Sequence, residues 1–488
     1  MSYQGEMEKD LLNAIGDRLE ELPGFLALSA AARTLPWPLF VVGGAVRDLI
    51  LKREVNDLDL TTAGPLDITA RQLSSALETR AIPLGRAPKQ TLRFALPELI
   101  IDLVPLEGGN IETELARRDL TINAMAVEFR PDRDRIRLID PWSGLEDLKQ
   151  KKARFVSEAV VLADPLRLLR LFRFAATLNL TPHPASLALV DKHAVLIRKM
   201  AGERIREELL KILAAPKSHA TMKTMMEQGL LSALIPELRL LQDCIQNAHH
   251  HLDVLDHTFQ AFSFLEEIME RPEQHFPDFV SEIKTYLAHE NRPALLKLAI
   301  LLHDLGKPAT RSEDGAGRVH FYKHEVIGVK TAAQIAGRFR LSRAEETFIC
   351  FIIRHHLQPF HLFTAQAANK LQPKGIYRFG RSAGPELWGL LLHALADAMA
   401  TRGPASEIHG GLPSLLAFFK HLILEITQQS QKLPRLVTGT DLMTAFGLPS
   451  SPLIGRLLVS IEEAQVTGQI HNKNEALILT AQLLKEQK

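Results

Sequence analysis

Asp57 and Asp59 stand two residues apart in the segment 57–62, where polar and apolar side chains alternate. This alternation predicts a β-strand, and residues two apart on a strand point to the same face of the sheet. Two neighbouring carboxylates repel each other, and Mg²⁺ with oxygen ligands relieves that repulsion. A lone Asp-x-Asp pair is more often a turn or a solvated strand edge, so the surrounding residues decide its role.

Gly43 and Gly44 follow a short β-branched and aromatic run at 39–42 and open a helical pattern. Their backbone N–H groups, at the positive end of a helix dipole, suit phosphate oxygens. A phosphate cradle beside a carboxylate pair indicates nucleotidyl transfer assisted by Mg²⁺ ions. Asp102, in a strand pattern at 99–104, is the candidate for a third carboxylate, and an acid at a strand end is the alternative.

The segment 117–126 brings Arg118 and Asp119 close to Asn123. A guanidinium group binds phosphate through two hydrogen bonds, and an Asn amide offers a donor and an acceptor to a sugar or to metal-bound water. The group therefore indicates nucleotide binding, with a helix cap and a surface ion pair as the alternative.

Asp164, Arg167 and Arg170 recur every three residues in an apolar helical pattern, so they share one face of a helix. An Asp–Arg pair presents acceptors and donors together, enough to read the edge of a base; an ordinary salt bridge is the alternative. The segment 163–212 carries nine basic and five acidic side chains, a net charge of +4 in a chain whose total is +1. This excess indicates an RNA-facing surface, which includes Arg173, Arg204 and Arg206.

His303 and Asp304 end an apolar helical run and offer a nitrogen and an oxygen to a metal ion. Lys307, close behind them, suits a phosphate, although a solvated lysine is the alternative. Further His and Asp residues in helical patterns accompany this pair: His257, His324, His355, His356 and Asp397. A lone His-Asp pair is usually structural, but the additional His and Asp residues favour a metal site.

Several folded units must position these residues. The 488 residues correspond to about three ordinary domains, and 46% hydrophobic with 24% charged residues is typical of a globular protein. Strand patterns largely stop near residue 150. We therefore expect an N-terminal helical segment, an α/β head, a helical neck for base selection and RNA binding, a helical domain with the His–Asp cluster and a helical tail, at 1–35, 36–150, 151–240, 241–400 and 401–488.

The composition also excludes some classes of protein. A total charge of +1 excludes a uniformly basic RNA-coating protein. Two cysteines, Cys244 and Cys350, are too few for a disulfide framework and favour a reducing compartment. Because we find neither a secretory signal nor an apolar run of about 20 residues, we expect a cytoplasmic protein without a membrane partner.

Five motifs follow one another across residues 36–215, namely GGAVRD, DLD, RRDLTINAMA, DPLRLLRLFRFAA and ERIREELLKIL. In this order they resemble the class II tRNA nucleotidyltransferase and bacterial poly(A) polymerase family. The resemblance implies a DNA polymerase beta-like α/β nucleotidyltransferase head, followed by an all-α body.

The same resemblance implies roles for single residues. Asp57 and Asp59 match the catalytic metal ligands, with Asp102 as the candidate third carboxylate. The nucleotide contacts fall on Gly43, Gly44, Arg47, Arg118, Asp119, Asn123, Asp164, Arg167 and Arg170. The family usually has Glu directly before the base-reading Asp, whereas this chain has Ala163, which leaves the identity of the added bases open.

The order His, His-Asp, His, His, Asp in the middle of the chain resembles the HD phosphohydrolase domain. The resemblance implies a divalent transition metal, whose bound hydroxide attacks a phosphate ester. The implied core ligands are His257, His303, Asp304 and Asp397. His324 and one of His355 and His356, with His356 favoured, complete a second metal site.

Together these resemblances imply an enzyme that adds C and A residues to tRNA 3′ ends from CTP and ATP with Mg²⁺. Its partner is the acceptor end of tRNA, and its oligomeric state stays open. One alternative is a poly(A) polymerase or an enzyme that adds only CC or only the final A. The other is chiefly an HD phosphohydrolase with an RNA-binding head.

Overall fold

The computed structural model describes residues 2–85, 90–129, 137–244, 253–289, 291–401, 411–430 and 434–486. The chain forms two compact units, Met1–Leu234 and Ile235–Lys488. The first contains the predicted head and neck, and the second contains the His–Asp cluster and the tail.

A seven-stranded sheet organises the head, in the order β3-β4-β5-β2-β1-β6-β7. Only β2 and β5 among these pairs run parallel, and all other neighbours are antiparallel. The predicted strand runs 39–42, 57–62 and 99–104 correspond to the three central strands β1, β2 and β5. The strands are β1 Leu39–Val42, β2 Asp57–Thr62, β3 Ile82–Leu84, β4 Thr91–Ala95, β5 Ile100–Pro105, β6 Ala126–Phe129 and β7 Arg137–Ile139.

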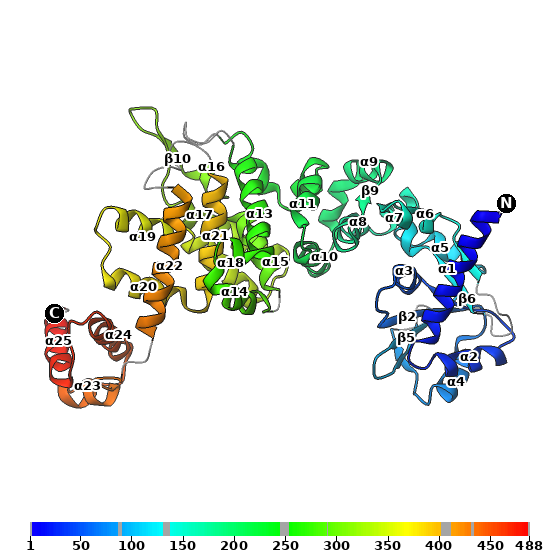
Figure 1. Cartoon of the computed structure of the whole chain (residues 1–488), viewed down its shortest axis with the longest axis horizontal. Coiled ribbons are helices and arrows are strands. Elements are labelled where there is room, and N and C mark those ends of the chain that lie inside the picture. The colour runs from blue at the N-terminus through cyan, green and yellow to red at the C-terminus, as the bar shows by residue number, and fades with distance from the viewer. Residues whose placement is uncertain are drawn as a thin grey trace. The chain divides into compact units, whose positions relative to one another are not determined.

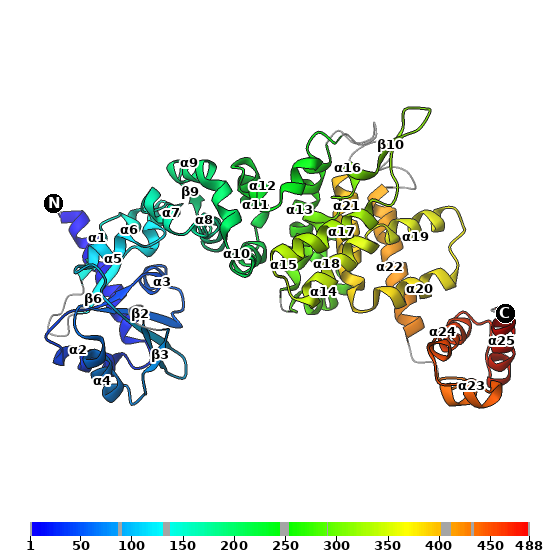
Figure 2. The same ribbon diagram turned by 180° about the vertical axis from the view of Figure 1, so that it is seen from behind.

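Short helices pack around this sheet, and α2 and α4 lie side by side in both views (Figures 1 and 2). The central strand β1 is buried along its whole length, as its apolar sequence requires. The helices of the head are α1 Ser2–Glu20, α2 Phe25–Thr34, α3 Gly44–Ile50, α4 Leu66–Ala76, α5 Ile111–Ala116, η1 Thr121–Asn123 and α6 Gly144–Lys149.

The neck continues the first unit with helices that each have an apolar face and a charged face. In α8, Leu168, Leu169 and Phe172 are fully buried, and the helix packs against α10. Burial of each such side chain contributes about 1.5–3 kcal/mol. The neck elements are β8 Lys152–Ala153, α7 Glu158–Ala163, α8 Arg167–Leu178, β9 Thr181–Pro182, α9 Pro184–His193, η2 Ala194–Lys199, α10 Gly202–Ala214, α11 Ser218–Glu227 and α12 Leu230–Leu234.

The second unit is built around α13, α15, α18 and α21, which pack against one another. α15 is apolar on nearly every side and is buried accordingly. The elements before α17 are η3 Pro236–Leu241, α13 Val254–Glu270, η4 Pro272–Gln274, η5 Pro277–Phe279, α14 Val280–Leu287, α15 Arg292–Leu302, α16 Lys307–Thr310, β10 Arg311–Glu313 and β11 Val319–Phe321. Those that follow are α17 His324–Arg338, α18 Arg343–His355, α19 Gln358–Ala367, α20 Pro373–Ala383, η6 Gly384–Glu386, α21 Leu387–Ala400 and α22 Gly411–Ser430.

The C-terminal helices α23 Gly439–Phe446, α24 Pro452–Val466 and α25 Lys473–Glu486 enclose a small core of their own (Figure 1). α22, which the sequence analysis assigned to the tail, instead packs against α20 and α21. The prediction of an α/β head followed by a helical body is confirmed, with two short two-stranded ribbons added to the body. No helix in the described ranges combines the length and the apolar character needed to cross a membrane.

Candidate active site and metal centre

The paired aspartates lie on β2, where the burial of side chains alternates. Leu58 and Leu60 are buried, whereas Asp57 is exposed and Asp59 is half-buried. Asp59 is in register with Asp102 on the parallel strand β5. The alternation therefore places Asp57 and Asp59 on one face of the sheet, as the sequence pattern predicted.

The glycine turn adjoins Asp59. Gly43 adopts φ 75° and ψ −130°, and a Cβ built on it would lie 3.7 Å from Asp59 Oδ2 and 3.0 Å from Arg118 Nη1. The absence of a side chain thus leaves room for a carboxylate and a guanidinium group together. The Gly43 N–H donates to the carbonyl of Met125 at 3.1 Å, so this N–H, which we expected to face a phosphate, belongs to the sheet.

The electrostatic setting of Asp59 fits a cation. Burial raises the pKa of Asp59, Arg118 opposes this, and the charges of Asp102 and Asp57 raise the pKa further. A carboxylate whose ionised form is destabilised in this way gains from a divalent cation. Asp57 and Asp59 are the residues that would hold Mg²⁺. An ion bound there would lower the pKa of an attacking hydroxyl and neutralise negative charge on a leaving group.

Asp102 differs from its predicted role as a third carboxylate. Its two oxygens accept hydrogen bonds from Arg93 Nε and Nη2 at 2.8 and 2.7 Å, across the antiparallel strands β4 and β5. Among the described residues, Asp57, Asp59 and Asp102 do not form a set whose ligand atoms all lie within 4.8 Å of one another. The structure thus makes Asp102 the partner of Arg93 and a neighbour of the candidate metal ligands.

Four of the predicted nucleotide contacts form one chain of polar contacts. Arg47 Nη1 donates to Asn123 Oδ1 at 2.5 Å, and Asn123 Nδ2 donates to Asp119 Oδ1 at 3.0 Å. Asp119 Oδ2 also pairs with Arg170 Nε at 2.7 Å. These contacts join α3 and η1 of the head to α8 of the neck. Since Arg47, Asp119 and Asn123 are buried, they fix the geometry beside the carboxylates.

Asp164 and Arg167, the residues predicted to read the base, each have another partner, so the salt bridge between them that was the alternative is not formed. Asp164 Oδ2 accepts a hydrogen bond from Arg204 Nη2 of α10 at 2.8 Å. Arg167 Nη1 donates to the backbone carbonyl of Val160 at 3.2 Å, and burial lowers its pKa. Both side chains therefore lie at the start of α8, each with a partner of its own, next to Ala163.

The three predicted RNA contacts differ in exposure. Arg173 pairs with Glu208 at 2.7 Å, lies over the ring of Phe174 and is largely buried. A surface role toward RNA is therefore not supported for Arg173, because its guanidinium group stabilises the α8–α10 packing. Arg204 is exposed and Arg206 is half-buried, both on α10.

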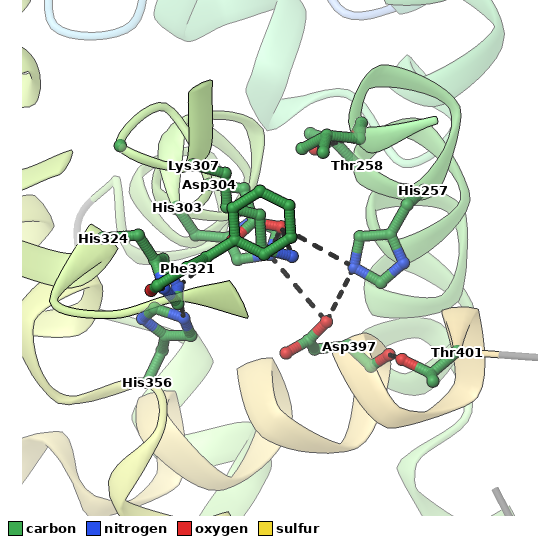
Figure 3. A network of polar contacts seen from close by, with 12 residues as sticks. His257, Thr258, His303, Asp304, Lys307, Phe321, His324, His356, Asp397 and Thr401 are labelled. Carbon is green, nitrogen blue, oxygen red and sulfur yellow. Dashed lines mark hydrogen bonds and ion pairs between the residues drawn. The ribbon is translucent and has the colours of Figure 1, made fainter. Parts of the chain in front are cut away.

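The His–Asp cluster gathers side chains from α13, α17 and α21 and from the C-terminal ends of α15 and α18 (Figure 3). His257 Nε2 of α13 lies 2.8 Å from Asp397 Oδ1 of α21 and 3.9 Å from Asp304 Oδ2. His303 Nε2 lies 3.1 Å from Asp304 Oδ2 and 3.8 Å from Asp397 Oδ1. All four predicted core ligands are thus within a few ångströms of one another, and all but Asp397 are almost fully buried.

A second group shares Asp304. His324 Nε2 lies 3.4 Å from Asp304 Oδ1 and 3.3 Å from His356 Nε2, on the other side of the cluster in Figure 3. The described ranges contain two sets of potential ligands, one with His257, His303 and Asp304 and one with Asp304, His324 and His356. His355 stands against the ring of Phe351, so the structure places His356 in the cluster and His355 outside it.

Three of these histidines are oriented by backbone carbonyls. Nδ1 of His303, His324 and His356 donates to the carbonyls three residues earlier, at 2.7, 2.9 and 2.7 Å. When Nδ1 carries the proton, the lone pair is on Nε2, which faces the cluster. This is the usual arrangement of metal-binding imidazoles. Burial lowers the pKa of His356 to about 3, so its ring is neutral and able to bind a metal. A set of imidazoles and carboxylates fits a divalent transition metal.

Two further residues belong to this neighbourhood. Lys307 Nζ lies 2.7 Å from Asp304 Oδ2. The alternative interpretation, a solvated lysine, does not describe this ion pair. His393 is fully buried on α21, with its ring 5.1 Å from that of His303 and 5.6 Å from that of His356. His393 was not predicted as a site residue from the sequence. The one feature that could have indicated it is its position one helical turn before Asp397.

Models of four known families match successive parts of the chain. The head matches the poly A polymerase head domain at 39–154. The neck matches the probable RNA and SrmB-binding site of polymerase A at 179–241. The HD domain matches at 254–381, and the tRNA nucleotidyltransferase domain 2 matches at 423–481.

Whole relatives match nearly the full length. The A-adding tRNA nucleotidyltransferase of Deinococcus radiodurans is 33% identical over 443 residues, which cover 89% of this chain and 93% of that protein. The chain belongs to the class II tRNA nucleotidyltransferase and poly(A) polymerase family. It is therefore an enzyme, a tRNA nucleotidyltransferase with an HD domain, and the resemblance seen in the sequence is confirmed.

Other relatives of this tRNA nucleotidyltransferase differ in the product that their names state. The CC-adding enzyme of Thermus thermophilus is 29% identical, over 90% of this chain and 92% of its own. A multifunctional CCA protein of Stenotrophomonas maltophilia is 29% identical but matches 69% of this chain and 80% of its own. The structure of a Thermotoga maritima CCA-adding enzyme complexed with tRNA has a TM-score of 0.65 and 20% identity, covering 96% of this chain and 98% of its own, which shows a shared fold.

Proposed function

We propose that this tRNA nucleotidyltransferase adds the final A to tRNA that already ends in CC, with ATP as the donor and Mg²⁺ as the cofactor. The observation that carries this choice is the match to the A-adding relative, which has the higher identity of the relatives compared above and spans most of both chains. The multifunctional CCA protein matches a smaller part of the chain.

The start of α8 supports an enzyme with a single base to select. Asp164 is held by Arg204, and Arg167 by the carbonyl of Val160. A side chain that reads first C and then A must change its hydrogen bonds between additions, whereas a fixed arrangement suits one base. Ala163 offers no carboxylate to reorient Arg167.

In the proposed reaction the head aligns a tRNA 3′-OH with the α-phosphate of ATP. Asp57 and Asp59 hold Mg²⁺, and Arg118, next to Asp59 and Gly43, stabilises the triphosphate. The buried contacts from Arg47 to Arg170 keep the neck in place against the head. Arg204 and the other cations of the neck contact the phosphates of the acceptor stem without selecting a sequence.

Three end-labelled forms of one tRNA test this proposal: one that lacks CCA, one that ends in C and one that ends in CC. We expect a single A on the CC form with ATP, and no extension of any form with CTP. Extension of the shorter forms by C residues with CTP would instead identify a CC-adding or a CCA-adding enzyme. A long ladder of A on unrelated RNA would identify a poly(A) polymerase.

The HD cluster supports a second activity, the hydrolysis of phosphate esters such as 2′,3′-cyclic phosphates with a bound transition metal. The observation is the set of imidazoles and carboxylates around Asp304, which are buried except for the partly exposed Asp397. Lys307, which already pairs with Asp304, is placed to contact a phosphate oxygen. Opening of a 2′,3′-cyclic nucleotide to its phosphate monoester by wild-type protein but not by the Asp304→Asn variant would support this activity. Equal opening by both would refute it.

A further inference from the structure

Tyr322 and Lys323 form a two-residue turn between β11 and α17, at the edge of the HD metal centre. The residue before the turn is tied to the centre (Figure 3): the ring of Phe321 lies 5.6 Å from Lys307 Nζ, and the carbonyl of Phe321 accepts a hydrogen bond from His324 Nδ1 at 2.9 Å. Since two residues of extended chain span at most about 7 Å, the Cα of Tyr322 lies within about 7 Å of the Cα of His324.

Both side chains of the turn face solvent. Tyr322 is 70% exposed, and Lys323 is exposed as well. In the part of the chain that the structure describes, Lys323 has no ion-pair partner, in contrast to Lys307, which pairs with Asp304 at 2.7 Å. The turn therefore offers an aromatic ring and an unpaired positive charge next to a site whose side chains fit a metal ion.

The ring of Tyr322 is held in place by His320, two residues earlier. The two rings are stacked, with centroids 5.1 Å apart and an interplanar angle of 11°. His320 is fixed in turn, because its Nε2 lies 3.1 Å from Asp314 Oδ2, and Asp314 Oδ1 accepts two backbone hydrogen bonds within the same β10–β11 ribbon, both at 3.0 Å. With one face against His320 and most of the residue exposed, the Tyr322 ring keeps its other face open to solvent.

An open aromatic face beside a cation suits a nucleotide. Every base has a π-face that stacks on such a ring, and a lysine attracts backbone phosphates; neither contact depends on the sequence. Tyr322, Lys323 and His324 thus offer a base contact, a phosphate contact and a metal ligand in immediate succession. A docking site for another protein is the alternative, and it does not explain why these groups adjoin a candidate centre for phosphate chemistry.

We propose that Tyr322 and Lys323 bind the last nucleotides of an RNA chain whose 2′,3′-cyclic phosphate reaches the HD centre. This inference rests on the phosphohydrolase activity proposed above, and it names RNA ends, rather than small phosphate esters, as the substrate class. The terminal base stacks on the open face of Tyr322, and Lys323 contacts the phosphate that precedes it. In the hydrolysis one P–O bond forms to the oxygen of water, one P–O bond of the cyclic phosphate breaks, and one proton of the water passes to the released ribose oxygen.

Three substrates separate the base contact from the phosphate contact. They are an RNA tetranucleotide that ends in a 2′,3′-cyclic phosphate, a 2′,3′-cyclic mononucleotide, and glycerol 1,2-cyclic phosphate, which has the same phosphate ring without a base. Tyr322→Ala should lower kcat/KM about 10-fold on the two substrates that have a base, and not on the glycerol compound. Lys323→Met should lower kcat/KM on the tetranucleotide alone and reduce its dependence on salt. Lys330→Met, at an exposed position two turns further along α17, is the matched control for the loss of a charge.

Binding without hydrolysis is measured on the metal-free full-length protein. The probe is the tetranucleotide with 2-aminopurine as its last base, whose fluorescence falls when the base stacks on an aromatic ring, and excess intact tRNA occupies the head and neck. Tyr322→Ala should bind this probe about 10-fold more weakly than wild type, and Tyr322→Phe, which keeps the ring, should restore the binding. Circular dichroism verifies that the variants are folded.

Two results would overturn the inference and leave the phosphohydrolase activity intact. One is equal probe binding and equal kcat/KM in Tyr322→Ala and wild type. The other is an equal loss on the glycerol compound, which would mean that the ring supports the fold of the centre and does not contact a base. If wild type opens no cyclic phosphate, the proposed activity fails, whereas weaker probe binding by Tyr322→Ala than by Tyr322→Phe would still support the RNA site.

Discussion

Replacement of Gly43 by Ala tests whether the glycine turn and the carboxylates form one site. At φ 75° and ψ −130°, a residue other than Gly carries a backbone strain of about 1–3 kcal/mol. The added Cβ would lie 3.0 Å from Arg118 Nη1 and 3.7 Å from Asp59 Oδ2, so Arg118 must move away. A displacement of about 1 Å can reduce a rate about 100-fold, and Arg118 must give by only a few tenths of an ångström. We therefore expect Gly43→Ala to lower the rate of nucleotide addition about 10-fold.

Gly44→Ala is the matched control. A Cβ on Gly44 would lie 3.5 Å from Arg47 Nη2, an ordinary van der Waals contact, and Gly44 has no positive φ. Single-turnover incorporation of labelled nucleotide into substrate tRNA measures both variants, and circular dichroism verifies that both are folded. A rate for Gly43→Ala within twofold of Gly44→Ala would refute the placement of the turn beside Asp59.

Two further predictions concern charges. Burial raises the pKa of Asp59, Arg118 lowers it, and only the ionised carboxylate binds Mg²⁺. Arg118→Met should therefore shift the acid side of the pH–rate profile, measured at saturating nucleotide, to higher pH. A shift to lower pH would contradict this prediction. Lys297 is buried with its Nζ 2.7 Å from Glu266, and burial lowers its pKa. Lys297→Ala should lower the free energy of unfolding by about 3–5 kcal/mol, measured with urea, because it leaves a buried carboxylate without this partner. A loss below about 1 kcal/mol would show that the pair contributes little.

The sequence predicts the centre of the head sheet well, and its edges poorly. β1 and β2 have the apolar or alternating patterns that their burial requires, so both were found at the right residues. β6, Ala126–Phe129, was missed because it begins at the last residue of a motif interpreted for its chemistry, and its extended form depends on pairing with β1. Long-range pairing of this kind leaves little trace in a single segment.

The same limit explains the differences within the site. The spacing of Asp164 and Arg167 predicted a shared helix face, but Asp164 is extended at the end of α7, and its partner Arg204 comes from 40 residues further along the chain. Arg173 lies in a basic segment that suggested an RNA contact, but in the structure it forms a largely buried ion pair with Glu208. His393 resembles a core residue of an apolar helix, and only the packing of α21 against other helices brings it to His303.

We propose that Asp57 and Asp59 of the head bind the Mg²⁺ used for nucleotide addition. Single-turnover addition to tRNA by Asp59→Asn, with the HD variant Asp304→Asn as its control, tests it directly. Loss of a metal ligand that stabilises the transition state by about 4 kcal/mol should slow Asp59→Asn about 1,000-fold, while Asp304→Asn keeps the wild-type rate. A wild-type rate for Asp59→Asn, or an equal loss in both variants, would contradict the claim.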